Sequence, residues 1–360
     1  MIYLRSTLRE FTAAGIAVFL VLLVITFTTQ LIRFLGFAAR GGIPTDAVLI
    51  LLGFSALGYL SVLLSAALFL SVLLTLTRVY RDSEMVVWQS SGLGLVAWLK
   101  PVLVYAAPVV VMVAVLSLYL TPWAIGKSEE YRHQLENRDD VSAVAPGVFK
   151  ESKSGERVFF VEKVSSDLSR VENIFVHSSQ NQRQGVMVAQ HGYTELASNG
   201  DRFLVLLNGR RYEGAPGQAD YRIVRFERYS VRIEQSESKA YFPSQKSLPT
   251  RALLDEPTRL NLSELTWRVG LPVSALVLAL LAIPLSAVNP RTGRFLNVLL
   301  AVFLYMIYSN LISIAQAWVA NGGIRPLFGM WIVHVAMLLL LAALLYRRVF
   351  GFRFRLLRLA

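Results

Sequence analysis

The stretch from Thr77 to Gly94, TRVYRDSEMVVWQSSGLG, is a short polar and amphipathic island between two long apolar runs. Met85, Val86, Trp88 and Gln89 can line one face of a short helix, and the Ser-Gly-Leu-Gly sequence that follows is typical of a helix end. A short helix between two membrane spans has two ordinary interpretations. It rests in the lipid interface, or it is a coupling helix by which a soluble motor moves the spans on either side.

The composition of the 360 residues places most of the chain in a lipid bilayer. Apolar residues make up 54% of the chain, and the mean hydropathy of +0.50 is too high for a soluble protein of this length. Cysteine is absent, which excludes disulfides and thiolate chemistry. The four histidines are widely separated and show no metal-ligand spacing, so we expect no metal site.

The net charge of +12 is unevenly distributed along the chain. Residues 127–259 hold 20 Lys and Arg against 19 Asp and Glu, whereas the remainder holds 16 against 5. We therefore expect a near-neutral soluble domain in the middle and a basic excess beside the membrane, where it sets orientation and contacts anionic headgroups. No basic patch is interleaved with aromatic residues in a soluble unit, so nucleic acid is not an expected partner.

Six apolar runs are long enough to cross a bilayer, three on each side of the polar middle segment. They cover residues 11–37, 47–76, 95–123, 269–288, 295–319 and 328–346. The tetrad NLSE at 261–264 is typical of a capping box that opens the helix carrying Arg268 into the membrane. We expect transmembrane helices in residues 1–126 and 261–360, with a coupling helix at about residues 80–92.

The middle segment, residues 127–260, changes to short runs of alternating residues that are typical of strands. The candidate strands are 158–161, 171–176, 185–196, 203–208, Tyr212 and 221–233, with turn signals between them that include Asn208-Gly209. Many short strands without a helical stretch predict a β-sandwich or jelly roll. Two sheets open at one side can hold an acyl chain or accept a strand from a partner; the alternative is a domain that merely packs.

The basic residues near the spans predict the orientation of the chain. With six spans, both termini lie on one side, which carries twelve basic residues against two in the opposite short turns, Arg40 and Arg325. The twelve are Arg5, Arg9, Arg78, Arg81, Lys100, Arg291, Arg294, Arg347, Arg348, Arg353, Arg355 and Arg358. Positive charge favours the cytoplasmic side, so we expect cytoplasmic termini, a cytoplasmic island at 77–94 and a β domain outside the cytoplasmic membrane.

Gln30 and Arg33 stand one helical turn apart at the far end of the first span. A lone arginine there ordinarily extends its head to the interface, and the alternative is a cation that faces an anionic substrate in a cavity. The spans hold no paired acids and no nucleophile beside a base. The GKS sequence at 126–128 lacks the earlier glycine and the strand of a phosphate-binding loop, so we expect no catalytic residue and no cofactor on this chain.

Three motifs resemble the LptF/LptG (YjgP/YjgQ) family of lipopolysaccharide-export permeases, and more closely its F-type subunit. They are YRDSEM at 80–85 with SGL at 91–93, GRRYEG at 209–214, and PLSAVNPRTGR at 284–294. Their order, together with three spans on each side of an external β domain, extends the resemblance over nearly the whole chain. The resemblance implies a helical membrane protein with an inserted periplasmic β-jelly roll.

The family resemblance also implies a function and partners. The chain would be a permease subunit of an ABC transporter that extracts lipopolysaccharide from the bacterial inner membrane and hands it to a periplasmic bridge. The implied partners are an LptG-type sister permease, two copies of an LptB-type cytosolic ATPase that binds ATP and Mg²⁺, and LptC-type and LptA-type jelly-roll proteins. Closure of the ATPase pair would narrow a lipid cavity between the permeases, lined by the first and fifth spans.

Two sets of site residues follow from the resemblance. Glu84 would be the acidic contact of the coupling helix with the ATPase, with Arg81, Met85 and Trp88 beside it. Arg33 matches a cation of the family's first span that faces the phosphates of the lipid, and Gln30 stands where the F-type pattern has a second cation.

A second function remains open at this point: a mechanotransmitting permease of another ABC exporter, which carries no lipid through its own spans. Such proteins usually place a large external domain after the first span, whereas here the β domain follows the third.

Overall fold

The computed structural model describes residues 2–40, 43–136, 147–151, 157–165, 170–180, 183–196, 202–214, 221–232, 242–287 and 294–350. The chain divides into two compact units. The helical unit comprises Met1–Gly36, Val48–Glu129 and Pro243–Ala360, and the β unit comprises Phe37–Ala47 and Glu130–Phe242. The β unit therefore shares residues 130–242 with the predicted segment 127–260 and also includes the turn Phe37–Ala47.

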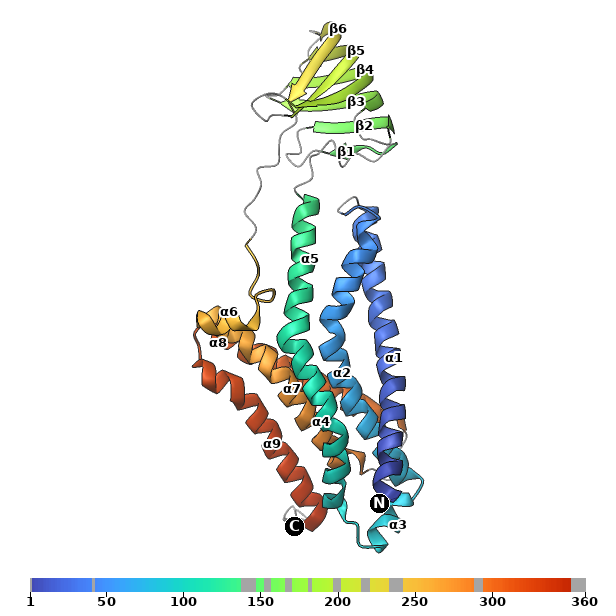
Figure 1. Ribbon diagram of the computed structural model, residues 1–360, viewed down its shortest axis with the longest axis vertical. Coiled ribbons are helices and arrows are strands. Elements are labelled where there is room, and N and C mark those ends of the chain that lie inside the picture. Colours follow the sequence, from blue (N-terminus) through green and yellow to red (C-terminus); the bar gives the residue numbers. More distant parts are fainter. Residues whose placement is uncertain are drawn as a thin grey trace, which may run out of the picture. The chain divides into compact units, whose positions relative to one another are not determined.

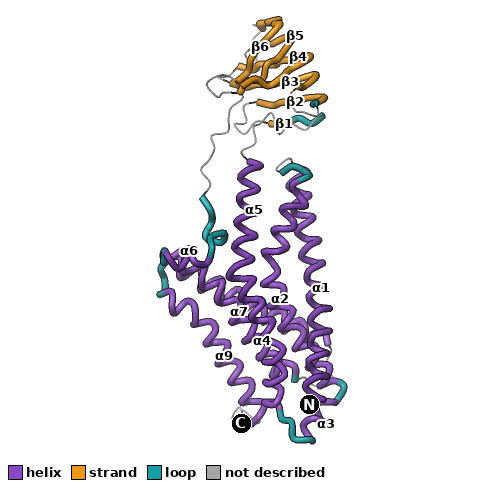
Figure 2. The backbone as a smooth tube through the Cα atoms, viewed as in Figure 1, coloured by secondary structure: helices purple, strands orange, loops and turns teal. Residues whose placement is uncertain are grey.

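The helices follow the apolar runs of the sequence (Figures 1 and 2). They are α1 Ile2–Ala39, α2 Ala47–Arg81, α3 Glu84–Ser90, η1 Leu95–Trp98, α4 Leu99–Val115, η2 Leu116–Leu120, α5 Thr121–Glu136, α6 Thr250–Asp255, α7 Arg259–Ser286, α8 Arg294–Ala320 and α9 Pro326–Phe350. Within the described ranges, six helical segments are long and apolar enough to cross a membrane, with η1, α4, η2 and α5 joined in the third. The predicted arrangement of three spans, a β insertion and three spans is confirmed.

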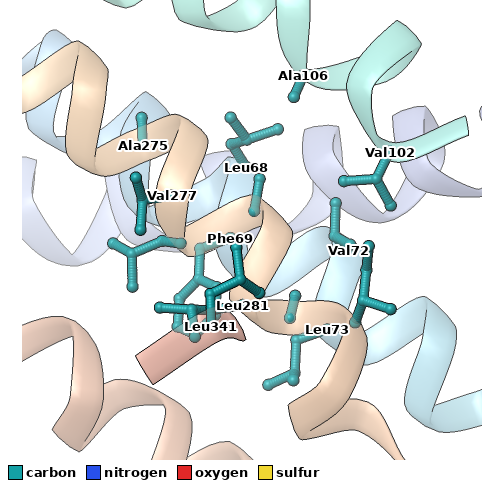
Figure 3. Packing of buried hydrophobic residues seen from close by; sticks show 14 of the residues in the cluster. Leu68, Phe69, Val72, Leu73, Val102, Ala106, Ala275, Val277, Leu281 and Leu341 are labelled. Carbon is teal, nitrogen blue, oxygen red and sulfur yellow. The ribbon is translucent and has the colours of Figure 1, made fainter. Parts of the chain in front are cut away.

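The fourth span, α7, is the central helix of the helical unit. In its membrane window 67% of the residues are buried, against 33% or less in the windows of the other five spans. It packs against α4, α6, α8 and α9. Figure 3 shows Leu281 of α7 among side chains such as Leu68 and Val72 of α2, Val102 of α4 and Leu341 of α9. Its polar residues Asn261, Ser263, Glu264 and Arg268 are among the buried ones, so α7 places inside the protein the polar groups that lipid cannot satisfy.

The start of α7 differs from the predicted capping box. The N-cap is Thr258, whose hydroxyl oxygen accepts a hydrogen bond from the Asn261 amide at 3.2 Å. Thr258 has an extended backbone, so its side chain can reach the exposed amides of the first turn. The helix therefore begins at Arg259, and Glu264 lies a full turn inside it, where it is 5% exposed.

The strands of the β unit form one antiparallel sheet. They are β1 Lys150–Glu151, β2 Arg157–Val164, β3 Arg170–Gln180, β4 Arg183–Leu196, β5 Arg202–Gly214 and β6 Tyr221–Arg232, and neighbours in sequence are neighbours in the sheet. The inserted β domain is confirmed, but the described strands lie in a single sheet in sequence order instead of two facing sheets. One cluster of buried side chains, including Val161, Ile174, Val176, Met187 and Leu206, forms its core.

The Asn208-Gly209 pair was predicted to be a turn, and this prediction is wrong. The pair lies inside β5, where Asn208 has a left-handed backbone with φ 51° and Gly209 pairs with Ala189 and Phe226. A Cβ atom on Gly209 would lie 2.3 Å from the Phe226 ring and 2.6 Å from the Val188 carbonyl oxygen. The glycine therefore allows close approach within a long, kinked strand.

The substitution Gly209→Ala tests this packing. We expect it to destabilise the β unit by about 1–3 kcal/mol, because overpacking forces shifts of backbone and rings. Gly185→Ala is the matched control, since its nearest obstacle is the Ser178 hydroxyl at 2.9 Å, which can rotate away. The measurement is the rate at which a protease cuts the β unit of the full-length protein in detergent. Equal rates for both variants would contradict the prediction.

Candidate functional site

The island at 77–94 forms a tight corner followed by a short helix. The second span α2 ends at Arg81, and the Asp82 amide donates to the Arg78 carbonyl oxygen at 2.9 Å. Ser83 then takes a left-handed backbone with φ 60° and turns the chain into α3, Glu84–Ser90. The expected coupling helix at about 80–92 is therefore shorter, and Arg81 belongs to the last turn of α2.

The predicted end of this helix is confirmed. Gly92 has φ 89°, the Leu93 amide donates to the Trp88 carbonyl oxygen at 3.0 Å, and the Gly92 amide donates to that of Gln89 at 3.0 Å. These two bonds and the left-handed glycine make a Schellman motif, which satisfies the last carbonyl groups of a helix.

The two faces of α3 have different environments. Met85 is 2% exposed and packs in the same cluster as Phe11 of α1, Val79 of α2 and Trp98 of η1, and Trp88 is partly buried against it. Val86 and Val87 are 65% and 67% exposed. The predicted grouping of Val86 with Met85 on one face is wrong, because successive helical residues point about 100° apart.

Burial, more than charge, holds α3 in place. Arg78 forms an ion pair with Glu10 of α1 at 2.7 Å and with Glu84 of α3 at 3.7 Å, and all three side chains are more than a third exposed. Exposed pairs of this kind are each worth about 0–1 kcal/mol, whereas burial of a methionine side chain contributes about 1.5–3 kcal/mol. The ion pairs therefore orient α3, while Met85 and Trp88 anchor it to the spans.

The exposed residues of α3 include the acidic Glu84 and the apolar Val86 and Val87, and we call these three the α3 face. It lies at the same end of the helical unit as the start of α1 and the end of α9 (Figure 1). Of the four residues predicted to contact an ATPase, Glu84 lies on this face, Arg81 is exposed and pairs with Asp82 at 3.1 Å, and Met85 and Trp88 point inward. Sequence analysis missed Val86 and Val87 as surface residues.

The two residues predicted at the lipid site point to different environments. Gln30 is 9% exposed and lines a small cavity with side chains of α2 that include Leu52 and Leu63. Arg33 is exposed and does not line that cavity. Of these two residues, Gln30 alone lines this small cavity, and the grouping of both at one lipid site stays a prediction. Only 11% of the membrane window of α1 is buried, so this helix presents a long apolar surface outward.

The β unit contains a cavity of about 670 Å³ that sequence analysis did not identify. Its walls include the apolar rings of Phe160, Phe175 and Phe226 and the cationic side chains of Arg210 and Arg225. Such a lining suits a ligand that is part apolar and part anionic. The cationic Arg210 lines the cavity and belongs to the GRRYEG sequence at 209–214, which sequence analysis had quoted as a motif. The cavity could not be predicted from this motif, because β2, β3, β4 and β6 supply the other walls.

The described residues thus form a multi-pass helical membrane protein with an inserted β unit and an anchored short helix that exposes acidic and apolar side chains. Residues 5–347 match the family model described as "Lipopolysaccharide export system permease LptF/LptG". The chain therefore belongs to this family of lipopolysaccharide export permeases, and the resemblance seen in the three motifs is confirmed.

Named relatives agree with the family match. The lipopolysaccharide export system permease protein LptF of Escherichia coli K12 is 31% identical over 342 residues, which cover 94% of this chain and 93% of the relative. The protein of the same description from Shigella flexneri matches with the same identity and coverage.

The anchoring of α3 predicts unequal effects of truncating its side chains. Met85→Ala should cost about 2–5 kcal/mol of local stability, because it leaves a cavity beneath the helix. Val87→Ala is the matched control, since its side chain is 67% exposed. Hydrogen exchange of residues 84–93 in detergent should speed up strongly for the first variant and little for the second. Similar exchange in both variants would show that burial does not anchor α3.

Proposed function

We propose that this chain is the F-type permease subunit of an ABC transporter that extracts lipopolysaccharide from the bacterial inner membrane and passes it to a periplasmic jelly-roll bridge. The observation that carries this proposal is the match of residues 5–347 to the family model, which includes both helical halves and the β unit. A mechanotransmitting permease of another exporter class is less favoured, because here the β insertion follows the third span.

The α3 face is the proposed docking surface for a cytosolic ATPase of the LptB type, of which two copies would serve this chain and an LptG-type sister. Glu84 supplies an exposed carboxylate for a cation on the ATPase. Val86 and Val87 supply apolar area that is released from water on docking. In this proposal ATP and Mg²⁺ are bound by the ATPase, and this chain contributes no catalytic residue.

Movement of α3 reaches the spans through its buried side. Met85 packs in one cluster with Phe11 of α1, Val79 of α2 and Trp98 of η1. Protein interiors are closely packed and transmit displacement, so a shift of α3 moves these three elements together. The ATPase can then alter the lipid site by binding the open and closed arrangements of the permease with different affinity.

The proposed lipid site lies along α1, against the sister permease. The outward apolar surface of α1 would bury acyl chains at about 25 cal/mol per Å² of apolar area. The exposed Arg33 would bind a phosphate of the lipid through charge-assisted hydrogen bonds. The cavity of the β unit, with its phenylalanines and arginines, is the proposed next binding site of the same amphipathic lipid. From there the lipid would pass to the LptC-type and LptA-type partners.

The distribution of basic residues supports the proposed orientation. Cytoplasmic termini and a cytoplasmic α3 place the twelve basic residues counted above on the cytosolic side, and the β unit in the periplasm. Among these twelve, Arg291, Arg353, Arg355 and Arg358 lie outside the described residues.

Reversing the charge of Glu84 tests the docking surface. Glu84→Lys should reduce co-purification of the ATPase at least tenfold. The substitution replaces an attraction between opposite charges with a repulsion between like charges, which costs more than about 1.4 kcal/mol of binding free energy. Glu10→Lys is the matched control, because Glu10 is a similarly exposed glutamate that pairs with the same Arg78 but lies on α1, outside the α3 face. Undiminished co-purification with Glu84→Lys would remove α3 from the proposed interface.

Neutralising Arg33 tests the lipid contact. A photo-crosslinking residue at Ile32, which is 67% exposed, should capture about tenfold less lipopolysaccharide in Arg33→Gln, because a hydrogen bond to a charged group contributes about 1.5–3 kcal/mol. Arg40→Gln is the matched control, since it removes the same charge just beyond α1. If capture is the same in both variants, Arg33 only extends its head to the membrane interface.

A further inference from the structure

Arg268 is a buried cation in the fourth span, and its guanidinium group makes four hydrogen bonds. Its side chain is 2% exposed. Nε donates to Glu264 Oε1 at 3.0 Å, Nη1 donates to Thr250 Oγ1 at 2.9 Å, and Nη2 donates to the carbonyl oxygens of Gln245 and Lys246, each at 3.1 Å. A charge in a membrane span is rare and generally functional, and this planar fork matches its acceptors in a way that a lysine cannot.

Two of these acceptors belong to the chain that returns from the β unit. Residues 243–249, which we call the return segment, enter the helical unit without helix or strand. Irregular backbone at a membrane span needs partners within the protein, because lipid offers none. Arg268 supplies donors for two carbonyl groups of this segment at once.

The same cluster connects the third and fifth spans to α7. The Thr250 hydroxyl donates to the Leu118 carbonyl oxygen, and the Ser117 hydroxyl donates to the Arg268 carbonyl oxygen at 3.0 Å. Ser117 and Leu118 lie in η2, a π-helical turn of the third span, a form found frequently at functional sites. From α8 of the fifth span, Gln316 Nε2 donates to Glu264 Oε2 at 3.3 Å.

The chain that leaves the helical unit is held to the chain that returns. Glu129 is the last residue before the β unit, and its carboxylate accepts from the Ser244 amide at 3.3 Å and from the Ser244 hydroxyl at 2.6 Å. One turn earlier, Gly126 lies close to Ser247, where an added Cβ would be 3.4 Å from the Ser247 carbonyl oxygen. Two of the chain's connections to the β unit, at 129–130 and 242–243, therefore leave the helical unit from one bonded point.

We propose that Arg268, the return segment and Glu129 form a joint that transmits movement of the third, fourth and fifth spans to the β unit. Arg268 is then a positioning residue for the transfer of lipopolysaccharide into the cavity of the β unit, an inference that rests on the proposed function. If the connections to the β unit were not held by these hydrogen bonds, the spans could move without moving the β unit. The joint makes the two connections move with α7.

The test replaces the planar guanidinium group of Arg268 with the compact ammonium group of a lysine. The measurement uses the complete transporter in lipid vesicles. Arg268→Lys keeps the charge but loses the fork. A photo-crosslinking residue at Val188, which is exposed and lines the cavity of the β unit, reports lipopolysaccharide delivered per ATP hydrolysed. We expect delivery per ATP to fall at least tenfold, with ATPase co-purification and hydrolysis within about twofold of the unchanged protein, a difference that would correspond to about 1.4 kcal/mol.

The control is Arg251→Gln, which removes an arginine that is 92% exposed on α6, next to the return segment. It should deliver normally. Unchanged delivery per ATP in Arg268→Lys would overturn the joint, whereas absence of crosslinking in the unchanged transporter would overturn the proposed function instead.

A disulfide provides a second measurement. The Cβ of a residue at 126 would lie 3.5 Å from that of Ser247, within the range that a disulfide bridges, and the chain has no other cysteine. Gly126→Cys with Ser247→Cys should restore delivery to Arg268→Lys when oxidised and lose it again on reduction. Failure of the oxidised form to restore delivery would overturn the proposal.

If Arg268→Lys does not accumulate, the pair Glu129→Gln and Ser244→Ala breaks the joint where the chain leaves the helical unit, without a change at the buried cation. Delivery per ATP should again fall several-fold at unchanged hydrolysis, and normal delivery would again overturn the proposal.

Discussion

The structure depends on one constraint: in hydrocarbon, every polar group that a span carries must find its partner inside the protein. The constraint is most demanding at α7, where Glu264 and Arg268 are buried in a helix that four others surround. Their charges neutralise one another at 3.0 Å, and they form further hydrogen bonds with α6, α8 and the return segment. The need to satisfy one buried ion pair thus draws a loop and three spans together.

The two ends of the helical unit use different interactions. At α3 the contacts beneath the helix are apolar, through Met85 and Trp88, and they are weakly directional. Such contacts suit an element that a partner displaces. At the joint, charge-assisted hydrogen bonds from Arg268 require a defined geometry. Such contacts suit an element that must move as a rigid body with the helix that holds it.

Much of this architecture was predictable, because long apolar runs and a helix stop at Ser91-Gly92 are local signals. The signals failed where partners distant in sequence decide the outcome. Seven residues of α3 do not reveal which face is covered, so Met85 and Val86 were grouped together. Asn208-Gly209 has the composition of a turn, but neighbouring strands on both sides keep it in a strand. A charge inside an apolar run and Glu264 four residues earlier mark Arg268 locally, but its acceptors at Gln245 and Lys246 lie more than twenty positions away and could not be predicted.

The proposed orientation requires α3 to be cytoplasmic and the β unit periplasmic, and cysteine accessibility measures this directly. The natural chain has no cysteine, so single cysteines at the exposed Gln89 of α3 and Glu172 of β3 report without background. In cells whose outer membrane alone is permeabilised, an impermeant maleimide should label Glu172→Cys and should label Gln89→Cys only after the inner membrane is opened. Labelling of both positions from the same side would contradict the account.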